Sequence, residues 1–555
     1  MADTPYTPEY KTLQLEILIN GTNEGLHSLL KKLQVNYELN KIPSAKLHFI
    51  SSNPEIDAEG DTLQSDALSV TDEIEVRTNT GEAAETLFKG IIHRVEKNAE
   101  GTEGFETKIE CKDIAVNLTS QQDVVADETF AEKMDRFLGE VDMTNEVRLE
   151  ALGEETVSKT QNITPWDYLV SYLDSLGMMS TVREGIFTIA DITEEPSDTS
   201  YLAQNGVNVF EFEAKQEDSV SDIEVRYWNP ETQSIETQES TTNVSNGSGR
   251  EVIDMSQSSY NTETLAQITE ARAAKNRLAT VKGKVKTFGN LTAKYGTYME
   301  FDNVNPDIDG TALLIKTEYH TIENGCWDTE YTFGLEDNQS FAQNISKSTP
   351  SSSAALIGQT NSMQGLQIGI VTQLEEDPAS EFRVRVRIPS ISDSAEGVWA
   401  RLSSFQAGNE RGAFFIPEVD DEVILGCINN NPDTPVILGK LYSSSNPMPF
   451  PIEADNNIQG IVSKEKTKII INDDDKSVEI STDKGNKLLV SDAEKGFVLE
   501  DENGNKIVMN GDGITIESTK DISLKAQGNI KVEGQQSTIK ASSTMEISGQ
   551  LIKLN

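Results

Sequence analysis

The sequence predicts a mainly β protein whose last fifth is a rod of short stacked strands. Two sets of apolar residues in the stretch 511–555 step by eight positions, namely Ile514, Ile522 and Ile530 and their partners Ile516, Leu524 and Val532. Each unit is an apolar–polar–apolar triplet, the pattern of a strand with one buried face. Residues that favour turns separate the triplets, and a fixed repeat of this kind is typical of a β-solenoid.

The repeat extends on both sides of these octads. Looser units precede them at Ile469/Ile471, Val478/Ile480, Leu488/Val490, Val498 and Ile507/Met509, and later units follow at Ile539 and Ile547. We therefore expect about a dozen strands in 461–555, none of which can bury a core alone. The spacing permits two architectures: one chain coiled on itself, three octads to a turn, or three intertwined chains that each supply one face of a triangular prism.

The remaining sequence predicts several β-rich domains joined by short helices. Residues 1–120 alternate between apolar and polar side chains, as strands do. In 121–255 we expect helices at Thr129–Gly139 and at Pro165–Gly177, the second with Thr164 as its N-cap. In 256–345 a helix at Glu263–Thr280 precedes more strands. A Ser/Thr-rich linker at 346–365, five short strands of an OB-type barrel at 366–445, a neck at 446–460 and the β-helix at 461–555 follow.

Composition narrows the class of protein. A chain of 555 residues with 36% hydrophobic and 25% charged residues suits a soluble, globular, strand-rich protein. We see no secretory signal at the N-terminus, and three distant cysteines, Cys111, Cys326 and Cys427, predict no disulfide framework. We therefore expect synthesis in the cytoplasm.

The net charge of −45 limits the kinds of molecule that the chain is expected to bind. Only 13 basic and 16 acidic residues follow position 460, so nearly all of the excess negative charge lies before the strand repeat. Such a surface repels nucleic-acid phosphates and anionic lipid headgroups. No nucleic-acid partner is expected, and a partner with a basic or neutral face fits better.

At 414–442 the sequence FFIPEVDDEVILGCINNNPDTPVILGKLY resembles the OB-fold core of VgrG-type spike proteins. The shared pattern is an aromatic–Ile-Pro run, an acidic pair, a Glu-Val strand, an Asn/Asp-rich Pro turn and a closing Gly-x-Leu-Tyr. FRVRVRIP at 382–389 is similar to the preceding strand, and ELNKIPSAKLHF and LFKGIIHRVE near the N-terminus are similar to the family's hub barrels. The resemblance covers the chain in the order hub, linker, OB barrel, neck and β-prism.

This resemblance implies two hub β-barrels with small helices, an OB-fold barrel and a C-terminal intertwined trimeric triangular β-helix. It implies a homotrimeric spike of a contractile injection system, either type VI secretion, a phage baseplate or a phage-tail-like particle. The hub would face a hexameric inner-tube protein among baseplate proteins, and the needle would pierce a target membrane mechanically. The interior of the needle would hold Ile514, Ile516, Ile522, Leu524, Ile530, Val532, Ile539 and Ile547.

The end of the chain still alternates, which would leave an exposed strand edge unless a partner covers it. We therefore expect a PAAR-like tip protein on Met545, Ile547, Leu551, Ile552 and Leu554. Some family members close their own tip with histidine-bound iron, but the four histidines here, His27, His48, His93 and His320, all precede the β-helix. No metal or other cofactor of the chain's own is expected.

Catalytic motifs are not found in the sequence. We find no HExxH, GxSxG, Walker or dinucleotide-binding pattern. The triplet Asp473–Asp475 fits a solvated turn, and acidic neighbours would account for Arg383, Arg385 and Arg387, which alternate along one strand. The chain is therefore predicted not to be an enzyme.

The predicted function is a trimeric spike that joins the inner tube to a membrane-piercing needle and carries a tip protein or effector. It would be assembled into an injection particle and released or translocated on contraction. Two other functions are kept as alternatives: a β-helix polysaccharide-degrading enzyme, which needs charged residues clustered in a groove, and a passive trimeric tail fibre or adhesin.

Overall fold

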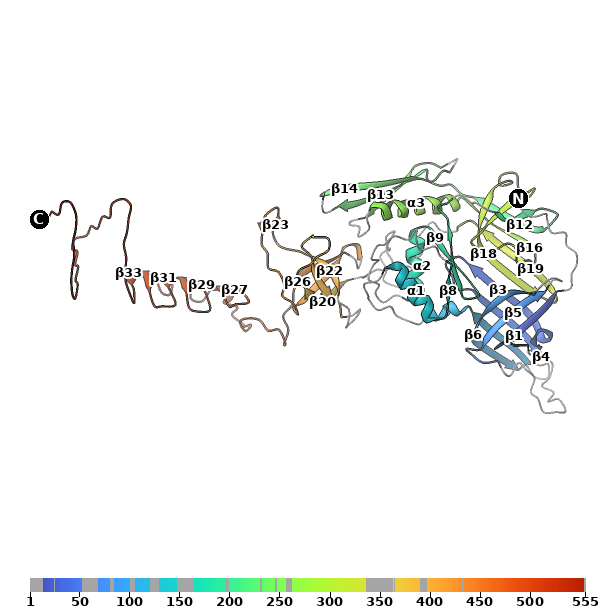
Figure 1. Cartoon of the computed structure of the whole chain (residues 1–555), viewed down its shortest axis with the longest axis horizontal. Coiled ribbons are helices and arrows are strands. Elements are labelled where there is room, and N and C mark those ends of the chain that lie inside the picture. Colours follow the sequence, from blue (N-terminus) through green and yellow to red (C-terminus); the bar gives the residue numbers. More distant parts are fainter. Residues whose placement is uncertain are drawn as a thin grey trace. The chain divides into compact units, whose positions relative to one another are not determined.

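In the computed structural model, the described residues are 13–23, 25–51, 68–79, 84–99, 105–119, 129–146, 164–194, 199–229, 232–244, 247–255, 262–335, 363, 365–389, 397–430 and 434–553. They form two compact units, Met1–Leu441 and Tyr442–Asn555 (Figure 1). Strands dominate both units, which confirms the mainly β prediction. Within these residues, no helix combines the length and apolar character needed to cross a bilayer.

A 13-stranded sheet organises the N-terminal part of the first unit. One half contains β1 (Gln14–Ile19), β2 (Thr22–Asn23), β3 (Leu30–Glu38), β4 (Ser44–Ser51), β5 (Glu73–Asn79), β6 (Glu85–Ala99) and β7 (Phe105–Lys112). The other contains β11 (Thr199–Gln204), β12 (Val209–Gln216), β16 (Val281–Phe288), β17 (Tyr298–Asp302), β18 (Ala312–Glu323) and β19 (Cys326–Phe333). Alternate residues point into a shared core, as Leu33, Val35 and Tyr37 do on β3.

The two halves of this sheet are hydrogen-bonded to each other. β3 pairs antiparallel with β18 from Glu38↔Thr317 to Lys32↔Glu323, so one sheet runs through both halves. β11 and β12 belong to the second half although they come from the stretch 121–255, because they pair with β17 and β16. Long-range pairing of this kind supplies partners for backbone groups that a free edge would expose, and no short sequence pattern encodes it.

The predicted helices are confirmed close to their expected bounds. α1 (Phe130–Glu140) begins with a capping box between Thr129 and Glu132, and α2 (Pro165–Ser175) is capped by the Thr164 side chain. Gly177 has a φ of 80°, the left-handed conformation that ends a helix at low cost in glycine. α3 is Thr262–Leu278.

Smaller elements surround these helices. β8 (Thr144–Asn145), β9 (Met178–Arg183) and β10 (Ile186–Asp191) form one three-stranded sheet, and β13 (Asp222–Asn229), β14 (Ser234–Thr241) and β15 (Arg250–Met255) form another. Leu265 and Ala273 of α3 share a small core with the second sheet. Short 3-10 turns lie at η1 (Leu26–Leu29), η3 (Ile114–Thr119) and η5 (Ile428–Asn430).

A closed five-stranded barrel follows, as predicted for 366–445. Its strands are β20 (Leu366–Gln373), β21 (Val384–Arg387), β22 (Val398–Leu402), β25 (Glu422–Cys427) and β26 (Pro435–Lys440), with the short hairpin β23 (Ala407–Gly408) and β24 (Arg411–Gly412) inserted. Val384 and Val386 point into its core. The acidic neighbour of Arg383 is Asp377 of the same barrel, 2.7 Å from the guanidinium.

A buried polar network ties β9 to the 13-stranded sheet. Arg183 of β9 donates to Glu318 of β18 at 2.6 Å, and Glu318 also lies 2.7 Å from His320. Burial acts to raise the pKa of Glu318, but Arg183 and His320 hold it below its usual value. The Arg183 guanidinium also lies 4.1 Å from the centroid of the Tyr37 ring. His320 is therefore a packed structural residue.

We predict that Arg183→Met destabilises this part of the protein by roughly 3–5 kcal/mol, because it leaves the buried Glu318 carboxylate without its counter-charge. Urea unfolding followed by tryptophan fluorescence measures the change. Arg94→Met is the matched control, since the Arg94–Glu96 pair is exposed and such pairs contribute little. Equal stability of the two variants would show that the network does not hold the fold.

Candidate trimerisation surface

The C-terminal unit contains one seven-stranded antiparallel sheet. Its strands are β27 (Ile458–Val462), β28 (Lys468–Asn472), β29 (Ser477–Ser481), β30 (Lys487–Ser491), β31 (Gly496–Glu500), β32 (Lys506–Asn510) and β33 (Gly513–Glu517). Each strand pairs with the next one along the chain. Six steps of about 4.8 Å give a height of about 29 Å.

This connectivity contradicts the single-chain coil for 458–517. A chain that coils with three strands to a turn would pair each strand with the third one after it, and a dozen strands would rise about 19 Å. Here neighbours in sequence are hydrogen-bonded neighbours in space. The strands of 458–517 therefore lie side by side in one sheet of a single chain.

One side of the sheet carries two continuous columns of apolar side chains. Cross-strand pairs place Ile461, Ile469, Ile480, Leu488, Leu499, Ile507 and Ile516 in one column and Ile471, Val478, Val490, Phe497, Met509 and Ile514 in the other. We call these thirteen residues the apolar face. All of them are 36–70% exposed in the single chain.

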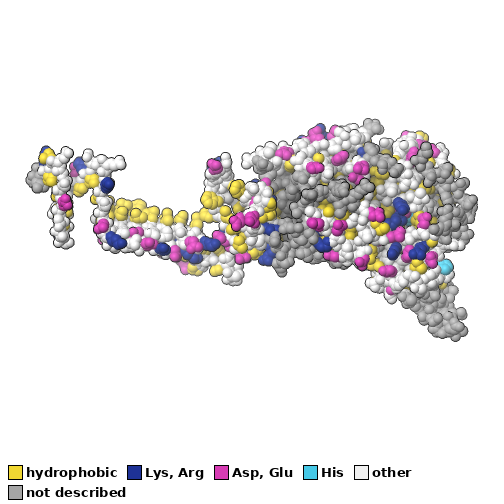
Figure 2. Space-filling view, viewed as in Figure 1, with side chains coloured by type: hydrophobic (Ala, Val, Ile, Leu, Met, Phe, Trp, Pro, Cys, Tyr) yellow, Lys and Arg dark blue, Asp and Glu magenta, His cyan; other side chains and the backbone are white. Residues whose placement is uncertain are grey.

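The opposite side of the sheet mixes charged, polar and apolar side chains, and its charged residues include one column of lysines. Lys468, Lys487 and Lys506 alternate there with serine and glutamate along one column, and ion pairs include Lys506–Glu517 at 3.6 Å. Figure 2 shows the apolar side chains as a band along one edge of this unit, with charged side chains on the other. Val498, which the sequence repeat placed among the apolar units, is on this opposite side, because its neighbours Phe497 and Leu499 point to the apolar face.

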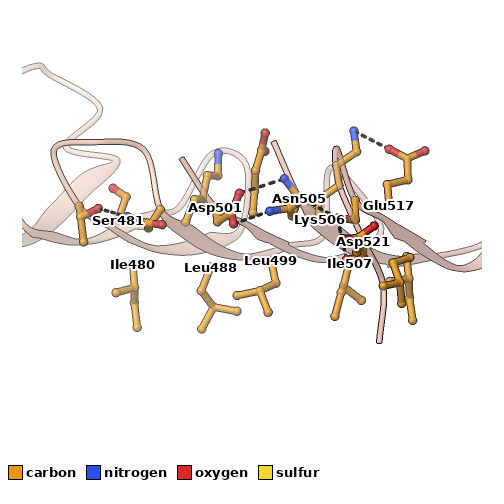
Figure 3. A pocket seen from close by; sticks show the side chains of 17 residues that line it. Ile480, Ser481, Leu488, Leu499, Asp501, Asn505, Lys506, Ile507, Glu517 and Asp521 are labelled. Atoms are coloured by element: carbon orange, nitrogen blue, oxygen red, sulfur yellow. Dashed lines mark hydrogen bonds and ion pairs between the residues drawn. The ribbon is translucent and has the colours of Figure 1, made fainter. Parts of the chain in front are cut away.

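A hollow runs along one column of the apolar face. Figure 3 shows Ile480, Leu488, Leu499 and Ile507 pointing the same way, while Asp501 and Asn505 lie on the other side of the ribbon. The first four come from β29, β30, β31 and β32, so the hollow crosses the strands rather than following one of them. Its apolar wall offers a long contact surface.

Turn residues hold the sheet in register without help from another chain. Ser463, Thr482 and Asp501 recur every nineteen residues, and the backbone N–H of each donates to the carbonyl four residues later. Successive turns are linked, because the Asn486 side chain accepts from Glu502 N–H and the Asn505 side chain accepts from Thr519 N–H. This nineteen-residue repeat of polar turn residues is visible in the sequence but was not predicted from it.

The acidic triplet Asp473–Asp475 lies in the turn between β28 and β29. The Asn472 side chain accepts from the backbone of Asp474 and donates to the Asp475 carboxylate at 2.8 Å. The triplet is therefore part of a turn built around Asn472, in agreement with the prediction.

The apolar face requires a cover. Completing the burial of a half-exposed Ile, Leu or Phe side chain is worth on the order of 1 kcal/mol, and thirteen such side chains lie in one continuous area. Monomeric soluble proteins rarely expose apolar patches of that size. A face of this shape fits a flat, equally apolar partner, and a copy of the same sheet has that property.

Three protein-family models match parts of this chain. The model of the Alg8 N-terminal domain matches residues 9–324, more than half of the chain. This chain belongs to that family. The model of the type VI secretion system/phage-baseplate injector OB domain matches 367–442, and that of the phage baseplate V C-terminal trimerisation domain matches 477–549.

The matched trimerisation domain includes most of the apolar face. It spans β29 to β33, whose apolar sides form the two columns, and it continues into the stretch after β33. The part of the chain with an uncovered apolar face is thus also the part that matches a trimerisation domain.

Curated relatives include VgrG spike proteins that match a short part of the chain. The type VI secretion system spike protein VgrG3 of Vibrio cholerae is 36% identical over 72 residues, which cover 12% of this chain and 7% of that protein. The spike protein VgrG1a of Pseudomonas aeruginosa is 30% identical over 73 residues, 13% of this chain and 11% of that protein. The chain thus spans about a tenth or less of these curated relatives' length. The resemblance to VgrG-type spike proteins is confirmed.

Solved structures share the fold at low sequence identity. A chain of the half-lidded PdpA–VgrG complex of Francisella has a TM-score of 0.54 and 11% identity, over 92% of this chain and 88% of that chain. A chain of the lidless PdpA–VgrG complex has a TM-score of 0.52 and 12% identity, over 92% of this chain and all of that chain. The likeness shows a shared fold over most of this chain.

The predicted needle-core residues fall into two groups. Ile514 and Ile516 of β33 belong to the apolar face, opposite Met509 and Ile507. The other six, Ile522, Leu524, Ile530, Val532, Ile539 and Ile547, lie beyond β33, are more than half exposed, and are in no strand of the described residues.

Strands are predicted beyond β33 as well, and the single chain has no strand in 518–553. A strand needs a hydrogen-bonded neighbour, and an intertwined strand finds its neighbours on other chains. The burial of these six residues inside a trimer stays a prediction.

The residues predicted to contact a tip protein lie in the same stretch. Met545, Ile547, Leu551 and Ile552 are all exposed. Leu554 lies outside the described residues. Their contact with a tip protein stays a prediction.

We predict that Leu488→Asp prevents trimer formation, because it places three carboxylates together under the apolar faces, each at a cost of several kcal/mol. The matched control is Leu489→Asp, one residue along the same strand and on the opposite side of the sheet. Size-exclusion chromatography with light scattering measures the mass. A normal trimer from Leu488→Asp, or equal loss from both variants, would contradict the assignment of the apolar face.

Proposed function

We propose that three copies of this chain form the spike and hub of a contractile injection machine. The observation that carries the proposal is the apolar face of β27–β33, most of which lies in the stretch that matches a trimerisation domain. Three such faces directed inward form a closed prism with the charged sides outward. The matches to an injector OB domain and to VgrG spike proteins support this use of the prism.

The prism suits mechanical work. Backbone hydrogen bonds between consecutive strands run along its length, and closure of three sheets leaves few exposed edges. When a sheath contracts, such a shaft transmits force to its tip and pierces a target membrane. The hub would join it to a hexameric inner-tube protein, since three chains with two sheet halves each present six similar units, and baseplate proteins would surround it.

The proposal includes no catalysis. A β-helix that degrades polysaccharide needs carboxylates gathered in a groove, whereas the carboxylates of Glu479 and Glu517 on the charged side are paired with lysines. A passive tail fibre does not explain the injector OB domain. The excess negative charge disfavours nucleic acid as a partner.

Cytoplasmic synthesis followed by assembly into an injection particle fits this role, with release or translocation on contraction. A PAAR-like tip protein would cover the strand edges at the end of the prism, and an effector would be carried with the spike. Exposed apolar residues from Met545 to Ile552 support a contact there.

Electron microscopy of the injection particle tests the proposal. We expect the chain on the particle axis as a trimer, between the inner tube and the tip. Twelve strand layers at about 4.8 Å predict a shaft about 58 Å long. Location on the outer surface of the particle, or a shaft nearer 20 Å, would contradict the proposal.

We predict that deletion of Ser548–Asn555 abolishes capture of the tip protein and leaves the trimer intact, because the deleted segment contains part of the exposed apolar end and none of β27–β33. A pull-down with the tagged spike measures the contact. Gln550→Asp in the full chain is the control, since it changes a polar residue in the same segment. Capture by the truncated spike would place the tip contact elsewhere.

A further inference from the structure

The three-stranded sheet of β13, β14 and β15 ends in an edge without a described neighbour strand. β14 pairs with β13 from Asp222↔Thr241 to Asn229↔Ser234, and among the described residues no other strand pairs with β14. Figure 1 shows β13 and β14 as a long hairpin beside α3. Every second residue of β14 directs its backbone N–H and C=O groups away from β13. We call this side of β14 the open edge.

The open edge lacks the features with which proteins usually protect an edge strand. Short length, β-bulges, proline and lysine commonly keep such a strand from pairing with another chain. β14 has eight residues in unbroken register with β13, and it contains neither proline nor lysine. The edge strand β12 of the 13-stranded sheet differs, because its register shifts between Val209 and Glu211 and it carries Lys215. β14 is therefore suited to accept a further strand.

Apolar side chains lie beside the open edge on the outer face of the sheet. Ile223, Val225 and Tyr227 pack with α3 on the inner face. The next residue, Trp228, and its cross-strand partner Ile235 therefore lie on the outer face. Ile235 is 67% exposed and Trp228 is 39% exposed. A strand added to β14 would place side chains next to Ile235 and bury apolar area there.

The charged side chains of β14 are all negative. They are Glu236 and Glu239. Hydrogen bonds of 2.6 Å from the Tyr227 hydroxyl and the Asn229 amide hold the pKa of Glu236 below its usual value, so this carboxylate is ionised at neutral pH. Glu239 lies 3.0 Å from Arg250, whose guanidinium is shared with a second carboxylate. Such an edge attracts a strand that carries lysine or arginine, because opposite charges on adjacent strands stabilise their pairing.

We propose that the open edge of β14 is a docking site for an extended, basic segment of another protein, which joins the sheet as a fourth strand. Backbone hydrogen bonds would hold the segment, and its side chains would select it. The favoured segment has an apolar residue beside Ile235 and basic residues beside Glu236 and Glu239. A second copy of this chain is disfavoured, because β14 and the chain as a whole are acidic. The inference does not depend on the proposed function.

Hydrogen–deuterium exchange of the purified full chain with two synthetic peptides tests this inference. The first peptide has eight residues, with three lysines among valines and threonines, and the second has three glutamates in place of the lysines. We expect the lysine peptide at saturation to slow exchange of the β14 amides that face away from β13 at least tenfold. The glutamate peptide should leave these amides unchanged. Mass spectrometry of fragments that cover 232–244 measures the protection.

A lysine on β14 supplies the matched variant. Thr237→Lys adds a positive charge at an exposed position of the strand, so we expect it to weaken binding of the lysine peptide at least tenfold. Gln216→Lys makes the same change of charge at an exposed position of the edge strand β12 and should leave the affinity unchanged. Fluorescence anisotropy of the labelled peptide measures both affinities.

Each other result overturns the inference. These results are no protection, protection only outside β14, equal protection by the two peptides, or equal loss of affinity in the two variants. Slow exchange of the outward β14 amides before any peptide is added also overturns it, because the edge is then already covered in the purified chain. None of these results bears on the apolar face of β27–β33, so the proposed function is tested separately.

Discussion

The need to cover the apolar face of β27–β33 is the constraint on which the C-terminal unit depends. The face consists of two columns of large apolar side chains, continuous over seven strands, that the chain itself leaves exposed. Hydrophobic burial is not directional, but it scales with area. A long flat strip therefore selects a partner that is equally long and flat.

The sheet does not depend on that partner for its register. Each strand pairs with its neighbour in the same chain, and side chains such as Asn486 and Asn505 link one turn to the next. Beyond Glu517 the described chain lacks such pairing, so its order must come from elsewhere. The C-terminal unit thus contains a part in which each strand pairs with a strand of the same chain and, within the described residues after β33, a part without strand pairing.

Local sequence signals predicted the local structure well. The capping residues Thr129 and Thr164, Gly177 after α2 and the alternating strands of the OB barrel act over a few residues, and the structure has them where expected. The β3–β18 pairing was not predictable in this way, because its partners lie almost 300 residues apart. Within the repeat, Val498 was assigned to the wrong side, since both it and its neighbours Phe497 and Leu499 are apolar and only the cross-strand register decides which pair faces inward.

The mass of the purified full chain in solution tests the central claim most directly. Native mass spectrometry or sedimentation equilibrium at micromolar concentration should give three times 61.1 kDa, and the trimer should persist on dilution. A chain that stays at 61.1 kDa with its apolar face exposed would contradict the account.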